Sequence, residues 1–119
     1  RIISGAVIGC DPEIMGIGPI NASKLALQRA GWNIEDIDIF ELNEAFSSQS
    51  IAVINELGID INKVNIDGGS LSIGHPLGAS GIRIIGKASS IMNRTNGKRA
   101  LASMCIGGGM GIAITLEKI

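Results

Sequence analysis

The 119 residues of the chain are enough for one domain with its own core, and 45% of them are hydrophobic although only 3% are aromatic. The net charge of −1 comes from scattered acidic and basic residues, which give no electrostatic footprint for nucleic acid. No apolar run approaches the ~20 residues that cross a bilayer, and no signal-peptide pattern opens the chain. We therefore exclude nucleic-acid and membrane partners and expect a cytosolic protein with an aliphatic core.

The N-terminal part predicts a strand, a glycine-punctuated loop and a helix. Arg1 to Cys10 is apolar and rich in isoleucine, which is typical of a strand covered on both faces. Pro19 suits the first turn of a helix that ends at Gly31. One face of this helix is apolar, with Ala22, Leu25, Ala26 and Ala30. Because the chain starts at Arg1, inside the expected strand, we expect it to be a piece of a longer protein.

The middle of the chain predicts two further strands around a second helix. Residues 37–43 are apolar on both alternating faces, which indicates a central strand. Residues 44–57 are amphipathic and predict a helix whose inner side carries Phe46, Val53 and Leu57. Residues 64–66 predict a short strand that leads into a glycine-rich loop.

The C-terminal part predicts a third helix and a hairpin. Ser80 is expected to cap a helix from Gly81 to about Met92, which is apolar all round and therefore buried. Residues 99–105 and 110–117 predict strands joined by a glycine turn. The whole order, βαβαβαββ, predicts one α/β domain over residues 1–119. Its sheet is expected to be five-stranded, mixed and mostly parallel, with helices on both faces and the last strand antiparallel.

The glycine-rich loop from Asp67 to Gly81 holds the only histidine of the chain, His75. Pro76 restricts the backbone on both sides of the histidine, so the ring is expected to be aimed at one place. An imidazole exchanges a proton near neutral pH without special tuning. A structural role in capping or packing is the alternative, but a loop of this composition favours a functional role.

Three polar side chains are expected to meet at the carboxyl edge of the sheet, where open α/β proteins form their sites. Asn43 ends the second strand, His75 follows the third, and Cys105 ends the last parallel strand. Three glycines after Cys105 expose backbone N–H groups that can stabilise a thiolate or an oxyanion. A thiol beside an imidazole suits nucleophilic chemistry or proton transfer next to a carbonyl, and the residues do not decide between the two.

Two other patterns carry no site. The two cysteines, Cys10 and Cys105, have neither the number nor the spacing of a disulfide framework or a zinc site, and Cys10 is expected to be a small buried residue. Residues 81–87 match the first seven positions of a phosphate-binding loop, GxxxxGK. Ala88 replaces the required Ser or Thr, and the segment is expected to be helical, so a nucleotide triphosphate site is disfavoured.

Three motifs in order resemble those of the C-terminal half of the thiolase family, and the resemblance covers nearly the whole chain: Asn43–Phe46 (NEAF), Gly74–Gly81 (GHPLGASG) and Cys105–Gly111 (CIGGGMG). Met15–Pro19 (MGIGP) also looks like the loop before that family's first C-terminal helix. The resemblance implies Claisen condensation of two acetyl-CoA molecules, or the reverse thiolysis. It implies CoA thioesters as substrates, no permanently bound cofactor, and a homo-oligomer. The ketoacyl synthases and the thiolase branches with histidine in place of Asn43 are disfavoured.

The resemblance also implies a role for each site residue. Cys105 would be the acid/base cysteine that removes the α-proton of the acetyl thioester. His75 would help to activate a nucleophilic cysteine and would donate to the thioester oxygen. Asn43 would hold the water that completes this oxyanion hole, and the Gly107 N–H would serve a second hole.

The chain departs from the family pattern in two ways. Asp67, Ser70 and Ser72 stand where the family usually has asparagine and alanines, a change expected to affect packing rather than chemistry. The family's nucleophilic cysteine lies in an N-terminal half, and Cys10 is not in a matching motif. We therefore expect the chain alone to be inactive in acyl transfer. A Cys/His thiol hydrolase and a non-catalytic assembly domain remain as alternatives.

Overall fold

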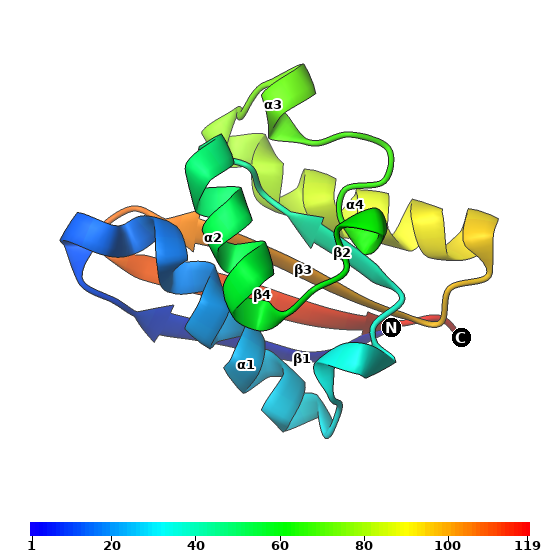
Figure 1. Cartoon of the computed structure of the whole chain (residues 1–119). Coiled ribbons are helices and arrows are strands. Elements are labelled where there is room, and N and C mark those ends of the chain that lie inside the picture. The colour runs from blue at the N-terminus through cyan, green and yellow to red at the C-terminus, as the bar shows by residue number, and fades with distance from the viewer.

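The computed structural model describes all residues from 1 to 119 and shows one four-stranded sheet with helices on both sides (Figure 1). The strands are β1 (Ile2–Gly9), β2 (Ile39–Leu42), β3 (Arg99–Ile106) and β4 (Met110–Glu117). The helices are α1 (Gly18–Ala30), α2 (Ser47–Leu57), α3 (Ser70–Ile73) and α4 (Leu77–Thr95). Short 3₁₀ turns lie between them: η1 (Pro12–Ile17), η2 (Ile34–Asp36) and η3 (Ile61–Lys63).

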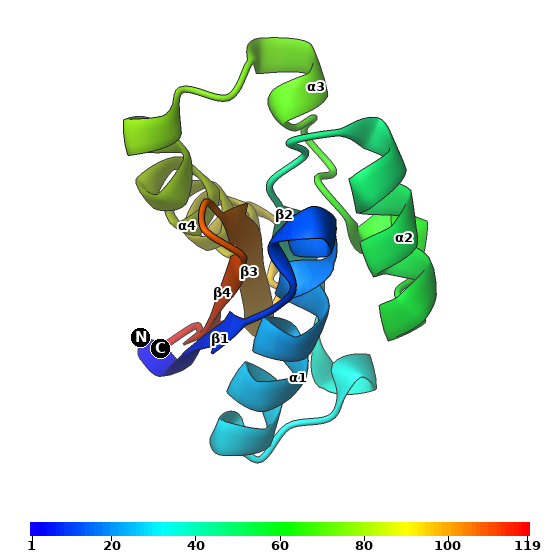
Figure 2. The ribbon, with the colours of Figure 1, turned by 90° about the vertical axis from the view of Figure 1, so that its left-hand side faces the viewer.

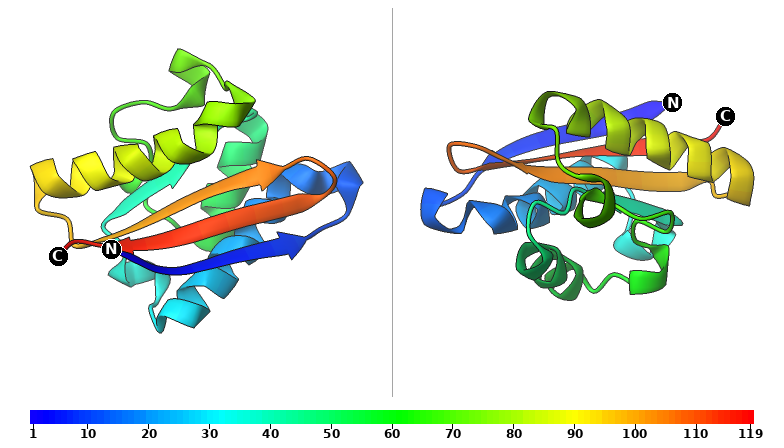
Figure 3. Two further views of the ribbon diagram at one scale, coloured as in Figure 1. Left: turned by 180° about the vertical axis from the view of Figure 1, so that it is seen from behind. Right: turned by 90° about the horizontal axis from the view of Figure 1, so that it is seen from above.

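The sheet has the order β1-β4-β3-β2, and three of its four strands run in one direction. Strand β4 is antiparallel to both neighbours, β1 and β3, whereas β2 is parallel to β3 (Figure 3). The predicted mixed sheet with an antiparallel last strand is therefore confirmed. Because that strand lies inside the sheet, only one of the three pairings, β2–β3, is parallel, so the pairing is not mostly parallel as predicted. The predicted fifth strand is wrong. Val64 forms a single bridge to Phe40, because the next residue, Asn65, has a positive φ of 45° that turns the chain away.

Helices cover both faces of the sheet, as predicted from the sequence. Helices α1 and α2 lie on one face and α4 lies on the other (Figure 2). The first face is filled by a cluster centred on Phe40 and Leu101, which packs against Val53 of α2 and Leu27 of α1. The second face is filled by Ile39, Ala88, Ile91, Met92, Ala100 and Leu116. The alternation of side chains along β2 and β3 thus separates two aliphatic layers.

Strand β1 corrects the expectation of a strand covered on both faces. It pairs only with β4 and forms an edge of the sheet, so Ala6 is its one buried residue and Val7 is 55% exposed. Cys10, directly after the strand, is half-buried rather than fully buried. An apolar run indicates a strand, but it does not reveal whether a second layer covers both of its faces.

Two helices also begin elsewhere than predicted. Helix α2 starts at Ser47, so Phe46 precedes it and is 62% exposed, whereas Val53 and Leu57 face the core as expected. Helix α4 starts at Leu77, four residues before the expected start at Gly81. Its Ile82 is 72% exposed, so the helix is not buried all round.

None of the helices combines the length and the apolar character needed to cross a bilayer.

Two glycines set the distance between α1 and the sheet. The backbone of Gly111 on β4 lies directly against that of Gly18 at the start of α1. A Cβ atom on either glycine would overlap the backbone of the other segment. Gly111 pairs with Cys105 across β3 and β4, so this close approach also fixes the strand end that carries the thiol. Ala22 and Ala26 of α1 continue the close packing against Ala6 and Ala113.

Candidate functional site

Asn43 and His75 meet beyond the carboxyl ends of β2 and β3. Asn43 follows β2, and its backbone N–H donates to the Ser103 carbonyl of β3 at 2.9 Å. The Asn43 side chain is only 1% exposed, and its Nδ2 lies 3.3 Å from Nε2 of His75. The structure thus joins two of the predicted site residues, which are 32 positions apart in the chain.

The other nitrogen of the His75 ring is held by the first turn of α4. Nδ1 lies 2.6 Å from Oγ of Ser80, and this hydroxyl donates to the Pro76 carbonyl at 3.2 Å. Ser80 is completely buried. Because α4 starts at Leu77, Ser80 is not the cap of the helix but an inner residue of its first turn, where its hydroxyl supports the imidazole.

The amide of Asn43 has partners on its other side as well. Ser70 Oγ donates to Asn43 Oδ1 at 2.7 Å, and a terminal nitrogen of Arg83 donates to Ser70 Oγ at 2.7 Å. The sequence pattern predicts neither Ser70 nor Arg83 as a site residue. The sequence offers one sign of each: Ser70 is a hydroxyl residue inside the glycine-rich loop, and Arg83 is a single arginine in an otherwise apolar part of a helix.

Glu44 ties the glycine-rich loop to the end of β2. Its Oε1 accepts from Asn65 Nδ2 at 2.7 Å, and its Oε2 accepts from the backbone N–H of Leu71 at 2.9 Å. Asn65 in turn binds both the N–H and the carbonyl of Leu42. Gly69 lies so close to the Glu44 carboxylate that a Cβ atom there would overlap it. Glu44 therefore places the loop, and with it His75, on the strand end.

Cys105 lies on the same edge of the sheet, at the end of β3, but its sulfur makes no hydrogen bond to Asn43 or His75. Its neighbour Met104 faces α4 near Gly81, so alternation along the strand directs the Cys105 side chain to the opposite face. Cys105 is buried, which raises the pKa of its thiol above the ordinary value, and the nearby thiol of Cys10 adds to this increase.

Gly107 lies in the turn after β3, where the chain is exposed. Its N–H donates to no backbone carbonyl, so the donor is unused. Asn43, His75, Cys105 and Gly107 thus share one edge of the sheet, although only the first two are in direct contact.

A buried carboxyl group lies behind the site. Glu41 of β2 is 0% exposed, and neither of its side-chain oxygens has a hydrogen-bond partner. Burial raises the pKa of Glu41 to about 7, although the positive charges of Arg83 and Lys87 on α4 oppose the rise. Glu41 is two positions before Asn43, and the only sign of it in the sequence is an acidic residue within an apolar strand.

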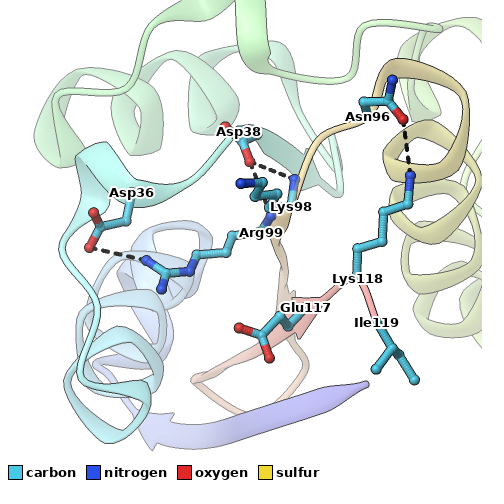
Figure 4. Close-up of a pocket in the computed structure, with 8 residues that line it drawn as sticks. All are labelled: Asp36, Asp38, Asn96, Lys98, Arg99, Glu117, Lys118 and Ile119. Carbon is cyan, nitrogen blue, oxygen red and sulfur yellow. Dashed lines mark hydrogen bonds and ion pairs between the residues drawn. The ribbon is translucent and has the colours of Figure 1, made fainter.

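The opposite end of the sheet has a hollow of about 650 Å³ (Figure 4). It is lined by Asp36, Asp38, Asn96, Lys98, Arg99, Glu117, Lys118 and Ile119. Its charged groups already bind one another or the backbone: Asp36 pairs with Arg99, and Asp38 accepts the N–H groups of Lys98 and Arg99. This hollow lies at the other end of the sheet from His75, and neither a histidine nor a cysteine lines it.

Comparison with known proteins places the whole chain in one family. Residues 1–118 match the family model described as thiolase, C-terminal domain. An acetyl-CoA acetyltransferase of Chromobacterium violaceum is 51% identical over 118 residues, and the cytosolic acetyl-CoA acetyltransferase of Mus musculus is 50% identical over 118 residues. The match covers 98% and 99% of this chain, respectively, but 30% of each relative.

Solved structures agree with this assignment. Human mitochondrial 3-ketoacyl-CoA thiolase, which has also been solved in complex with CoA, superposes with a TM-score of 0.98 at 48% identity. The Bacillus anthracis acetyl-CoA acetyltransferase superposes with a TM-score of 0.98 at 42% identity. Each match covers 100% of this chain and 30% of the solved one. The chain belongs to the thiolase family, whose named relatives are acyltransferases, and it corresponds to their C-terminal domain.

Proposed function

We propose that the chain is the C-terminal catalytic part of an acyl-CoA C-acyltransferase. The reaction is the condensation of two acetyl-CoA molecules to acetoacetyl-CoA and CoA, or the reverse thiolysis. Relatives named acetyl-CoA acetyltransferase support this choice, and so does a solved CoA complex of a relative. The observation that carries the proposal is the Asn43–His75 contact at 3.3 Å on the sheet edge where β3 ends in Cys105.

In this proposal each side chain has one task. Cys105 removes the α-proton of an acetyl thioester and returns protons to the leaving thiol. Burial raises the pKa of the Cys105 thiol, which makes its thiolate, once formed, a stronger base toward the α-proton. His75 takes the proton of the nucleophilic cysteine and donates to the thioester oxygen. Asn43 holds the water that completes this oxyanion hole, and the unused Gly107 N–H serves the second hole.

The nucleophilic cysteine that the family resemblance implies would lie in the part of the relatives that this chain does not span. An apolar surface is open on the side where such a part would pack, with Leu71, Ile73, Leu77 and Ile82 all more than 60% exposed. Exposed side chains of this size on neighbouring segments are typical of a protein–protein contact. We propose that an N-terminal thiolase half covers α3 and α4, and that the complete enzyme is a homo-oligomer.

The test uses the chain in two forms. Alone, with acetyl-CoA, it is expected to form neither an acyl-enzyme nor acetoacetyl-CoA. Joined to the N-terminal part of the Chromobacterium violaceum relative, it is expected to catalyse condensation. In this hybrid, Cys105→Ala should abolish condensation while labelled acetyl transfer to the other cysteine remains. Asn43→Ala should lower kcat by about 10²–10³-fold, the usual loss for one oxyanion-hole group.

Two other functions make different predictions. A Cys105/His75 thiol hydrolase would show iodoacetamide-sensitive esterase activity in the isolated chain. An assembly domain would lose only stability when either residue is replaced. A cytosolic location stays a prediction, because one relative is named cytosolic and another mitochondrial.

A further inference from the structure

The polar groups around Asn43 form a chain in which each donor determines the next acceptor. Arg83 is a donor only, so Ser70 Oγ must accept from it at 2.7 Å. The Ser70 hydroxyl donates its one proton to Asn43 Oδ1, which lies 2.7 Å away. With Oδ1 toward Ser70, the Asn43 amide directs its Nδ2 donor at His75.

This orientation determines which nitrogen of His75 carries the proton. Because Asn43 Nδ2 can only donate, Nε2 of the neutral ring must be the acceptor, and the ring proton must lie on Nδ1. Nδ1 then donates to Ser80 Oγ, and the Ser80 hydroxyl donates onward to the Pro76 carbonyl. The hydroxyls of Ser70 and Ser80, the Asn43 amide and the His75 ring thus each donate to an acceptor.

The opposite orientation of the amide leaves a buried group without a partner. If Nδ2 of Asn43 faced Ser70, the Ser70 oxygen would accept two donors and its own proton would have no acceptor. Ser70 is buried, so this loss is not made good by bulk water. Arg83 is itself confined, since its Nε atom is buried and its charge faces the buried carboxyl of Glu41.

We propose that Ser70, held by Arg83, is a positioning residue that fixes the orientation of the Asn43 amide and thereby places the neutral-ring proton of His75 on Nδ1. In the acyltransferase the unprotonated Nε2 would take the proton of the nucleophilic cysteine in exchange for its hydrogen bond from Asn43 Nδ2. That consequence rests on the proposed function, whereas the tautomer itself does not. Ser70 touches no reacting atom and acts only through Asn43.

The test measures the tautomer directly in the 119-residue chain. His75 is the only histidine, so its two ring nitrogens give the only imidazole ¹⁵N signals. At about pH 8.5, above the usual imidazole range, these signals distinguish a protonated nitrogen from an unprotonated one. The wild-type chain is expected to show Nδ1 protonated and Nε2 unprotonated.

Three variants isolate the effect of the Ser70 hydroxyl. Ser70→Ala is expected to move the two ¹⁵N signals toward each other, because losing one hydrogen bond shifts the balance of amide orientations by about five-fold. Ser70→Thr, which keeps the hydroxyl, should retain the wild-type pattern. Ser72→Ala is the matched control, since the Ser72 hydroxyl donates only to the Gly69 carbonyl and should leave both signals in place.

Two results would overturn the proposal. One is a wild-type ring protonated on Nε2. The other is a Ser70→Ala variant that keeps the wild-type ¹⁵N pattern while its backbone amide spectrum shows an intact fold. Neither readout depends on acyl transfer, so an inactive hybrid enzyme would count against the proposed function and not against the role of Ser70.

Discussion

The two ends of the sheet handle polar groups in opposite ways. At the carboxyl end of β2, the side chains of Asn43, Ser70 and Ser80 are buried and linked in series by hydrogen bonds to His75. At the other end, a hollow of about 650 Å³ is lined by charged side chains such as Asp38 and is open to solvent. The first end is filled by its own hydrogen-bonded side chains, whereas the second is hollowed.

We interpret unused hydrogen-bonding capacity, rather than volume, as the mark of the proposed site. In the hollow, Asp38 binds two backbone N–H groups and Lys118 binds Asn96, so a ligand would have to displace existing partners. At the carboxyl end, the Gly107 N–H donates to no backbone carbonyl and the Cys105 sulfur makes no hydrogen bond to another residue. A ligand that binds there forms hydrogen bonds without breaking existing ones.

The strongest way to disturb the carboxyl end is to push α1 off the sheet. Gly111→Ala places a Cβ atom inside the backbone of Gly18, so either α1 or β4 must move. We expect a loss of about 3 kcal/mol or more in the free energy of unfolding, measured in urea. Because Gly111 pairs with Cys105, amide signals around the thiol should shift as well.

Gly86→Ala is the matched control for this prediction. Gly86 is an exposed residue of α4, and a Cβ atom there would meet nothing within 4 Å. We expect the chain to become more stable by about 0.5–1 kcal/mol, because alanine favours a helix interior over glycine. If both variants destabilised the chain equally, the close approach of α1 to β4 would not be the cause.

Glu41, at the buried end, is expected to make the stability of the chain depend on pH. Burial raises the pKa of Glu41 to about 7 from its ordinary value of 4.5, so between these pH values the folded chain keeps a proton that the unfolded chain releases. Stability from this group therefore falls as the pH rises from about 4.5 to 7 and stays low above that range. Between the two ends of this pH range, the free energy of unfolding changes by about 3 kcal/mol because of Glu41.

Glu41→Gln removes this ionisation and keeps the shape of the side chain. We expect the variant to be more stable than the wild type at pH 8 and to lose most of the advantage at pH 5, as measured by urea unfolding at both values. The charged groups that face Glu41 are Arg83 and Lys87 on α4, Asp67 in the loop and Glu44 after β2. An equal effect at both pH values would show that Glu41 is ionised throughout.

Much of the fold follows from local patterns. The 3.6-residue periodicity before Gly31 predicts α1 correctly, and Gly31 ends the helix with a left-handed φ of 69°. The apolar segments 37–43 and 99–105 correspond to β2 and β3. The wrong predictions of burial have a common cause: Phe46, Val7 and Ile82 are apolar but exposed, because burial depends on which layers are present and the chain spans only 30% of its relatives' length.

The site is predictable only in part, for a similar reason. Asn43 and His75 stand out as a strand-end amide and a loop histidine, and the structure joins them. Ser70, Arg83 and Glu41 act through partners more than ten positions away, and no periodicity reports such pairs. For Cys105, the strand end is predictable but the direction of the sulfur depends on the register of β3.

At the open end of the sheet, removing one charged side chain should change the free energy of unfolding less than a change at the buried end. Asp38 is exposed, and its Oδ2 accepts from the N–H groups of Lys98 and Arg99 at 2.7 and 3.1 Å. We expect Asp38→Ala to cost about 1 kcal/mol in urea unfolding, because water replaces the lost acceptor. The imidazole ¹⁵N signals of His75 should not move. A shift there would mean that the two ends are coupled through β2.

Arg99→Lys should have the smallest effect. The Arg99 guanidinium lies 4.6 Å from the centre of the Trp32 ring and 3.7 Å from Asp36, in a half-exposed position. Lysine keeps the charge but loses the flat stacking surface, so we expect a cost of about 0.5 kcal/mol. Urea unfolding at low and high salt separates the two contributions. The part due to Asp36 should vanish at high salt, while the stacking part remains. A cost that disappears completely at high salt would leave the ion pair as the only contribution.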